Sequence, residues 1–163
     1  MRTLLLLRHA KSSWSDPGRT DHDRPLTERG KQDAPRMGQL LQEQGLVPEL
    51  IVSSTAKRAR KTAKKVARSC GYAGEITETD ALYLAPVAQY LELLRQLPDQ
   101  HQRVLLVGHN PGLEDVIETL TGRCERLSTA TLAQITFEVA SWRELGAATS
   151  GQLVNLWRPK ELQ

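Results

Sequence analysis

The sequence has few cysteines, no long apolar run and little excess charge. Its two cysteines, Cys70 and Cys124, show neither metal-ligand spacing nor a disulfide framework, which favours a reduced, cytoplasmic protein. The leucines at 4–7 are too few for the core of a signal peptide, and no apolar run approaches the length of a membrane span. A net charge of +3 is far from the clustered positive face of a nucleic-acid-binding protein. We therefore expect neither nucleic acid nor membrane among its partners.

The remaining composition, with 39% hydrophobic and 25% charged residues, is that of an ordinary folded domain. We expect a single domain over residues 1–163. Buried-strand patterns alternate with helical spacing, which predicts an α/β fold with a mostly parallel central sheet. The expected strands cover 3–7, 50–52, 75–79, the start of 103–112, 131–139 and 152–157. The expected helices cover 28–44, 56–70, 86–97 and 113–120, and a polar turn around Gly146 joins the last two strands.

Chemically unusual residues follow three of the expected strands. They are Arg8-His9, then Ser53-Ser54 leading to Arg58, and then Gly108-His109-Asn110. Because ligands of open α/β sheets bind at the carboxyl ends of the strands, we expect these three segments to form one site.

Each segment by itself has an ordinary explanation. A histidine after a strand, such as His9, is more often structural than catalytic, and His109 is explained equally well by a polar turn. The basic run at 57–68 reads mostly as a solvated helix face. Arg58 differs, because it lies in the first turn of the expected helix, where the positive end of the helix dipole repels a cation. Such a cation is tolerated if an anion lies above the helix. Two histidines and two arginines converging at one sheet edge are improbable by chance, so the combination favours function.

These residue types fit phosphoryl transfer. A guanidinium offers a planar fork of donors to phosphoryl oxygens, and a neutral imidazole is a competent nucleophile toward phosphorus. We predict His9 as the nucleophile, with Arg8, Arg58 and His109 as a clamp that neutralises the phosphoryl charge. This chemistry requires no metal and no cofactor.

The motifs together resemble the histidine phosphatase superfamily, which is also called phosphoglycerate mutase-like. They are "LRHAKSSW", "DRPLTERG", "SSTAKRARKTA" and "VGHNPG", and the resemblance extends over essentially the whole chain. It implies a three-layer α/β/α sandwich and a phosphatase with a phosphohistidine intermediate on His9. Arg8, Arg58 and His109 would then bind substrate, and we add Lys11 and Asn110 to that set. The compact length, "RHAKSSW" and "GHNPG" look most like the SixA branch, which implies phosphohistidine on a signalling or phosphotransfer protein as substrate.

The general acid and the substrate stay open. Other members of the superfamily use a Glu or Asp as general acid, and here Glu78 and Asp80 lie only in roughly the right region. One alternative is a small-molecule phosphomonoesterase of the same superfamily, and a second is a non-catalytic phosphoprotein-binding module. A metal hydrolase is disfavoured, because His22 and His101 have no ligand spacing with the other two histidines.

Overall fold

The computed structural model describes residues 1–146 and 150–162. Within these residues the strands form one six-stranded sheet in the order β3-β2-β4-β1-β5-β6. Strands β3, β2, β4 and β1 are parallel to one another, whereas β5 is antiparallel to β1 and β6 is antiparallel to β5. The strand bounds are Arg2–Arg8 (β1), Leu50–Ser54 (β2), Ile76–Thr79 (β3), Arg103–Gly108 (β4), Leu132–Phe137 (β5) and Gln152–Trp157 (β6).

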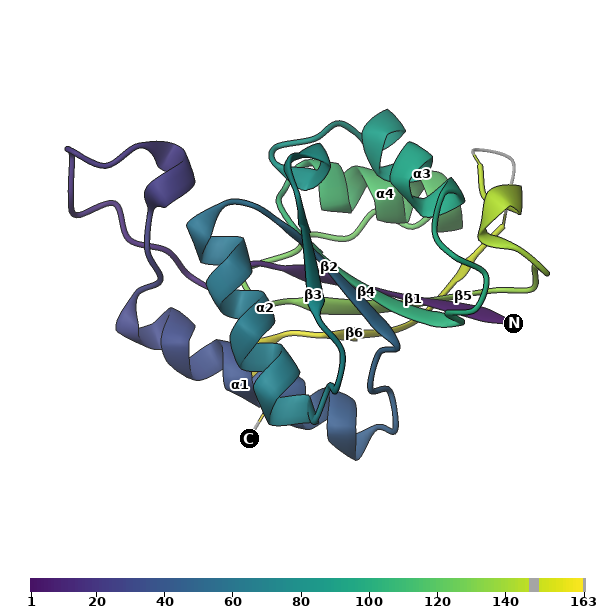
Figure 1. The fold of residues 1–163 in the computed structure, drawn as a ribbon, viewed down its shortest axis with the longest axis horizontal. Helices are drawn as coiled ribbons and strands as arrows, with labels where there is room; N and C mark the ends of the chain where they lie inside the picture. Colours follow the sequence, from purple (N-terminus) through teal and green to yellow (C-terminus); the bar gives the residue numbers. More distant parts are fainter. Residues whose placement is uncertain (147–149, 163) are drawn as a thin grey trace.

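Helices cover both faces of this sheet. Helices α1 (Glu28–Glu43) and α2 (Lys57–Cys70) lie on one face, and α3 (Val87–Arg95) and α4 (Gly112–Thr121) lie on the other (Figure 1). Single-turn helices η1 to η4 occupy Asp21–Asp23, Asp80–Leu82, Trp142–Glu144 and Pro159–Glu161. The predicted three-layer α/β/α sandwich, with its mostly parallel sheet, is confirmed.

The four leucines of β1 explain why this strand lies inside the sheet. All four are fully buried, and successive side chains point to opposite faces. Leu4 and Leu6 belong to the core under α3 and α4, while Leu5 and Leu7 belong to the core under α1 and α2. Since β1 pairs with β4 on one side and β5 on the other, its carboxyl end is held rigidly.

The observed elements differ from the expected ones at a few points. Strand β2 extends through Ser54, because Ser53 and Ser54 are fully buried and Ser54 pairs with β3. Helix α1 begins at the expected residue, after the N-cap Thr27, whose hydroxyl accepts from the Gly30 amide, but it ends at Glu43, one residue before the expected end. The segment at 11–25, between the first expected strand and the first expected helix, contains the η1 turn. The polar turn expected around Gly146 falls partly on residues 147–149, which lie outside the described residues.

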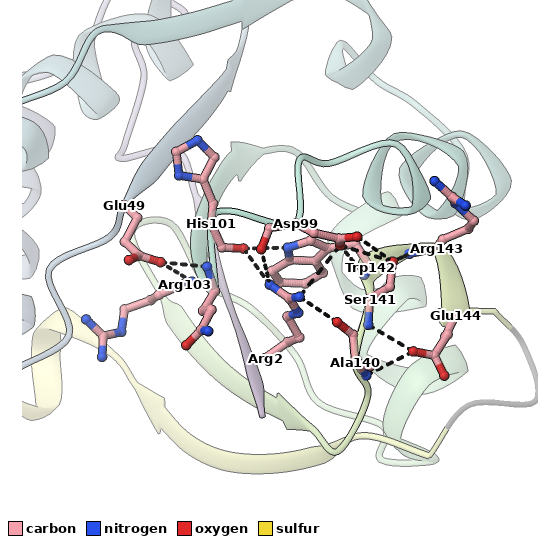
Figure 2. A network of polar contacts seen from close by, with 11 residues as sticks. Arg2, Glu49, Asp99, His101, Arg103, Ala140, Ser141, Trp142, Arg143 and Glu144 are labelled. Carbon is pink, nitrogen blue, oxygen red and sulfur yellow. Dashed lines mark hydrogen bonds and ion pairs between the residues drawn. The ribbon is translucent and has the colours of Figure 1, made fainter.

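A polar network closes the edge of the sheet at which β1 begins, opposite to the end that carries His9 (Figure 2). The Arg2 guanidinium donates to the backbone carbonyls of Asp99 (2.7 Å), His101 (3.2 Å) and Ala140 (2.6 Å). The buried Trp142 indole donates to the same His101 carbonyl at 2.6 Å. These bonds tie two connecting segments, the one between α3 and β4 and the one between β5 and β6, to the start of β1, so this edge is closed by structural contacts.

Candidate active site

The three polar strand ends meet at one edge of the sheet, at the left in Figure 1, where the segment after β1 projects from the sandwich. Arg8 pairs in register with Gly108, and the His9 amide donates to the Gly108 carbonyl at 3.1 Å. The imidazole centroids of His9 and His109 are 5.2 Å apart. The adjacency of β1, β4 and β2 therefore brings the predicted residues together, and their catalytic roles stay predictions.

A cavity of about 390 Å³ opens at this edge. Its lining consists of Arg8, His9, Lys11, Ser12, Trp14, Asp21, Arg24, Arg58, Leu84, His109, Asn110 and Thr129. The segment between β1 and α1 supplies many of these side chains. The predicted nucleophile His9 and all five predicted clamp and substrate-binding residues are among them. The volume is sufficient for a phosphoryl group together with part of the group that carries it.

The His9 side chain is buried and held in one orientation. Its Nδ1 lies 2.8 Å from the carbonyl oxygen of Ala10, which can only accept, so Nδ1 carries the proton. The lone pair is therefore on Nε2. Burial lowers the pKa of His9 to about 3, a shift that the bond to Ala10 partly opposes and the charge of Arg58 reinforces. The imidazole is consequently neutral at physiological pH, which is the protonation state that a nucleophile requires.

His109 is fixed by contacts from two elements, α3 and β2. Its backbone amide donates to the Tyr90 hydroxyl at 3.2 Å, and its Nε2 lies 2.8 Å from Ser54 Oγ. Ser54 Oγ also accepts from the Ala56 amide, and within the described residues His109 Nε2 is the acceptor available to the Ser54 hydroxyl proton. We therefore assign the imidazole proton of His109 to Nδ1. In the described residues that Nδ1 is buried without a partner. Burial, reinforced by Arg58, lowers the pKa of His109 to about 3.

The two arginines are held differently. Arg8 donates from Nη1 to the Leu127 carbonyl at 3.0 Å, and burial lowers its pKa, although Glu114 opposes that shift. Arg58 is 3% exposed and donates from Nη1 to the Asp21 carbonyl at 2.7 Å and from Nη2 to the Asp21 carboxylate at 3.0 Å. The anion expected above the start of α2 is thus supplied by the protein itself.

Asp21 is a site residue that the sequence did not single out. Besides Arg58, its carboxylate accepts from Arg24 at 2.9 Å and from the Tyr83 hydroxyl at 2.6 Å. Burial acts to raise the pKa of Asp21, but the bonds from Tyr83 and the two arginines outweigh it and hold that pKa well below its usual range. The segment 11–25 holds three aspartates, and no local pattern distinguishes Asp21 from the others.

A family model described as "Histidine phosphatase superfamily (branch 1)" matches residues 4–83. An uncharacterised chloroplast protein of Arabidopsis thaliana is 35% identical over 152 residues, which are 88% of this chain and 70% of that protein. The chain belongs to the histidine phosphatase superfamily. Among solved structures, SixA of Agrobacterium tumefaciens, designated a phosphohistidine phosphatase, has a TM-score of 0.83 at 31% identity, covering 97% of this chain and 98% of that one. SixA of Nakamurella multipartitia, with the same designation, has a TM-score of 0.85 at 27% identity, covering 97% and 96%. Family and fold together support a phosphatase activity.

The remaining predicted residues of this histidine phosphatase lie in three different settings. Lys11 is exposed at the mouth of the cavity. Asn110 donates from Nδ2 to the Leu127 carbonyl (2.8 Å) and to Glu114 (3.1 Å), which ties the elbow after β4 to α4. Glu78 and Asp80 are exposed and do not line the cavity. The structure thus gives no support to either as general acid.

Two further findings concern metals and membranes. Within residues 1–146 and 150–162, no group of three or more His, Cys, Asp or Glu side chains could hold a metal ion. His22, weighed as a ligand above, instead contacts Thr55 Oγ1 at 2.9 Å. Over the same residues, no helix is long and apolar enough to cross a membrane.

Proposed function

We propose that this histidine phosphatase hydrolyses phosphohistidine on a signalling or phosphotransfer protein in the cytoplasm, through a phosphohistidine intermediate on His9 and without a metal. One observation carries the proposal. The Ala10 carbonyl holds the proton of His9 on Nδ1, so the lone pair of Nε2 is presented beside Arg8, Arg58 and His109. A binding module would need only the cationic groups and would have no use for an oriented, neutral imidazole.

The first step transfers the phosphoryl group to the enzyme. His9 Nε2 attacks phosphorus, the P–N bond to the substrate histidine breaks, and the substrate imidazole leaves after taking a proton from solvent. Arg8 and Arg58 stabilise the charge on the equatorial oxygens. His109 donates a hydrogen bond from Nδ1 to one of these oxygens, so the buried Nδ1 gains the hydrogen-bond partner that it lacks among the described residues.

The second step regenerates the enzyme. A water molecule attacks phosphorus opposite to His9, the P–Nε2 bond breaks, and the water proton passes to the departing phosphate or to solvent. His9 returns to the neutral form with its proton on Nδ1. The pKa of about 3 favours this outcome, because the free imidazole of His9 holds no second proton at neutral pH.

The acid–base groups of the cavity favour phosphohistidine over an alkyl phosphate. An alkoxide is a poor leaving group, and general acid catalysis contributes about a hundredfold or more to its departure. In the described lining the single carboxylate is that of Asp21, and two arginines keep it ionised. It therefore has no proton to give. An imidazole leaves once protonated by solvent, so phosphohistidine does not need that acid.

The rim of the cavity favours a protein substrate. Trp14 is 76% exposed and Leu84 is 56% exposed, and both line the cavity mouth. The Arg24 guanidinium lies 3.2 Å from the centroid of the Trp14 ring, which holds the indole in place. Exposed aromatic and aliphatic side chains around a polar centre are typical of protein–protein contacts.

The test compares substrates. We expect kcat/KM for a phosphohistidine protein to exceed that for an alkyl phosphomonoester such as phosphoglycerate by about a hundredfold or more. Glu78→Gln and Asp80→Asn should each leave phosphohistidine hydrolysis largely unchanged. Faster hydrolysis of alkyl esters would instead establish a small-molecule phosphomonoesterase. Tight binding of the phosphoprotein without release of phosphate would establish a binding module.

A further inference from the structure

A second hollow opens beside the catalytic cavity and shares part of its wall. It has a volume of about 370 Å³, and Arg8, Lys11 and Thr129 line both spaces. Arg29, Asp33 and Lys160 also line the second hollow. We call this space, defined by these residues, the basic groove. Because the same Arg8 side chain borders both spaces, a chain that leaves the catalytic cavity can continue into the basic groove.

The "DRPLTERG" motif positions one wall of the basic groove. Thr27 donates from its backbone amide (2.9 Å) and from its hydroxyl (3.3 Å) to the Lys11 carbonyl. A Cβ on Gly30 would lie 2.2 Å from that carbonyl, so only glycine allows the first turn of α1 to pack this closely. The contact sets Arg29 beside the strand end that carries Arg8, although Arg29 takes no part in the predicted clamp.

The opposite wall comes from the far end of the described chain. The Arg36 guanidinium of α1 donates to the Leu162 carbonyl at 2.7 Å, and Arg158 donates to the Arg126 carbonyl at 2.9 Å. These bonds hold the η4 turn, with Lys160, across α1. The groove wall is therefore built by long-range contacts.

The charge of the basic groove is strongly one-sided. Its described lining has four cations, Arg8, Lys11, Arg29 and Lys160, and one carboxylate, Asp33, which lies 3.5 Å from Arg29 as an ion pair. Arg29, whose side chain is 61% exposed, and the exposed Lys11 and Lys160 keep contact with solvent. Exposed cations suit the carboxylates of a protein surface, whereas a specific phosphate subsite uses buried, preorganised guanidinium groups.

From this arrangement we propose that the basic groove binds an acidic segment that flanks the phosphohistidine of the substrate protein, with Arg29 and Lys160 as specificity-determining residues. The inference rests on the proposed function and names which phosphoproteins suit it. Carboxylates on that segment pair with Arg29, Lys160 and Lys11 while the phosphohistidine occupies the catalytic cavity. Selectivity then comes from charge outside the reacting centre.

The experiment compares two synthetic phosphohistidine peptides of equal length, one with glutamates beside the phosphohistidine and one with serines there. At low ionic strength we expect kcat/KM about tenfold higher for the glutamate peptide. The double variant Arg29→Glu/Lys160→Glu should abolish that preference. The matched control Lys61→Glu/Lys64→Glu has the same change in net charge on exposed lysines of α2, outside both spaces, and should retain it. Hydrolysis of p-nitrophenyl phosphate, which has no flanking segment, should be equal in all variants.

The outcomes separate the groove from the activity. Equal hydrolysis of both peptides by the unmodified enzyme overturns the groove and leaves the proposed function intact. An equal loss of preference in the α2 control also overturns it, because the effect is then one of net charge. If neither peptide is hydrolysed, the proposed function fails. Fluorescence anisotropy with the His9→Ala variant then tests the groove separately: tighter binding of the glutamate peptide than of the serine peptide supports it, and equal binding overturns it. The acidic-segment assignment is also overturned if the enzyme shows no preference for the glutamate peptide but hydrolyses fructose 1,6-bisphosphate with a higher kcat/KM than fructose 6-phosphate, and if that difference requires Arg29 and Lys160.

Discussion

The Asp21 carboxylate accepts a hydrogen bond from Arg58 Nη2 at 3.0 Å, and the Asp21 carbonyl accepts one from Arg58 Nη1 at 2.7 Å. The guanidinium that is expected to hold the phosphoryl group is thus already paired with an anion of the protein. A phosphoryl group must either displace the carboxylate or share the guanidinium with it. Since Asp21 lies on the η1 turn between β1 and α1, this pairing links that segment to the start of α2.

Asp21→Asn should strengthen phosphate binding. Loss of the carboxylate charge removes the competitor for Arg58, so we expect KM for p-nitrophenyl phosphate and Ki for inorganic phosphate to fall by about three- to tenfold. Asp23→Asn is the matched control, because it removes the same charge from the same turn at an exposed position outside the cavity. A fall in kcat with unchanged KM would show that Asp21 acts on the chemical step instead.

His9→Ala should lose activity by more than about a thousandfold while keeping the native circular dichroism spectrum, because the substitution removes the proposed nucleophile. Rapid quench of the unmodified enzyme should trap a phosphoenzyme that is stable in alkali and labile in acid, as phosphoramidates are. His101→Ala serves as control, since the His101 side chain is exposed at its contact with Gln100 and lies at the opposite edge of the sheet. Label on a serine, or full activity of His9→Ala, would refute the nucleophile.

Removal of metal ions should leave activity unchanged. The guanidinium groups of Arg8 and Arg58 supply the positive charge that a metal would otherwise bring to the phosphoryl oxygens. The check is p-nitrophenyl phosphate hydrolysis before and after exhaustive dialysis against a chelator, with a zinc-dependent phosphatase as positive control. Activity that returns only with added zinc or magnesium would contradict the mechanism.

The two buried histidines should make the protein less stable in mild acid. Both have a pKa of about 3 when folded, against an ordinary value of 6.5, so the unfolded chain binds more protons between these values. The free energy of unfolding should therefore fall as the pH drops from about 7 to about 4.5. Urea denaturation at the two pH values measures the fall, and His9→Gln should show a smaller one. An equal fall in His9→Gln would mean that His9 does not contribute.

Gly30→Ala should destabilise the protein by about 1–3 kcal/mol, because the new methyl group meets the Lys11 carbonyl oxygen and forces α1 away from β1. Gly146→Ala is the control, since among the described residues a Cβ there has no atom within 4 Å and the backbone has no positive φ. Urea denaturation measures both. Equal stability of Gly30→Ala and the unmodified protein would show that the segment adapts without cost.

The sequence by itself determined the architecture and the position of the site along the chain. The run of leucines in β1 is buried on both faces of the sheet, and the helices begin and end near their expected residues. Both signals are local, because burial repeats with the period of the element that produces it. The rule that ligands bind at the carboxyl ends of parallel strands then located Arg8, His9, Arg58 and His109 at one edge.

Only the tertiary structure decided which partners these residues have. The pairing of Asp21 with Arg58, the bond between Ser54 and His109, and the lining of one space by both Arg29 and Lys160 bring together residues far apart in the chain. No local pattern encodes such pairs, because they depend on how strands and helices pack. The same packing leaves Glu78 and Asp80 outside the cavity, although their sequence region had suggested a general acid. The hydrophobic periodicity of a strand or helix determines which face a residue occupies, whereas only the packing of the sheet and helices determines which residues it contacts.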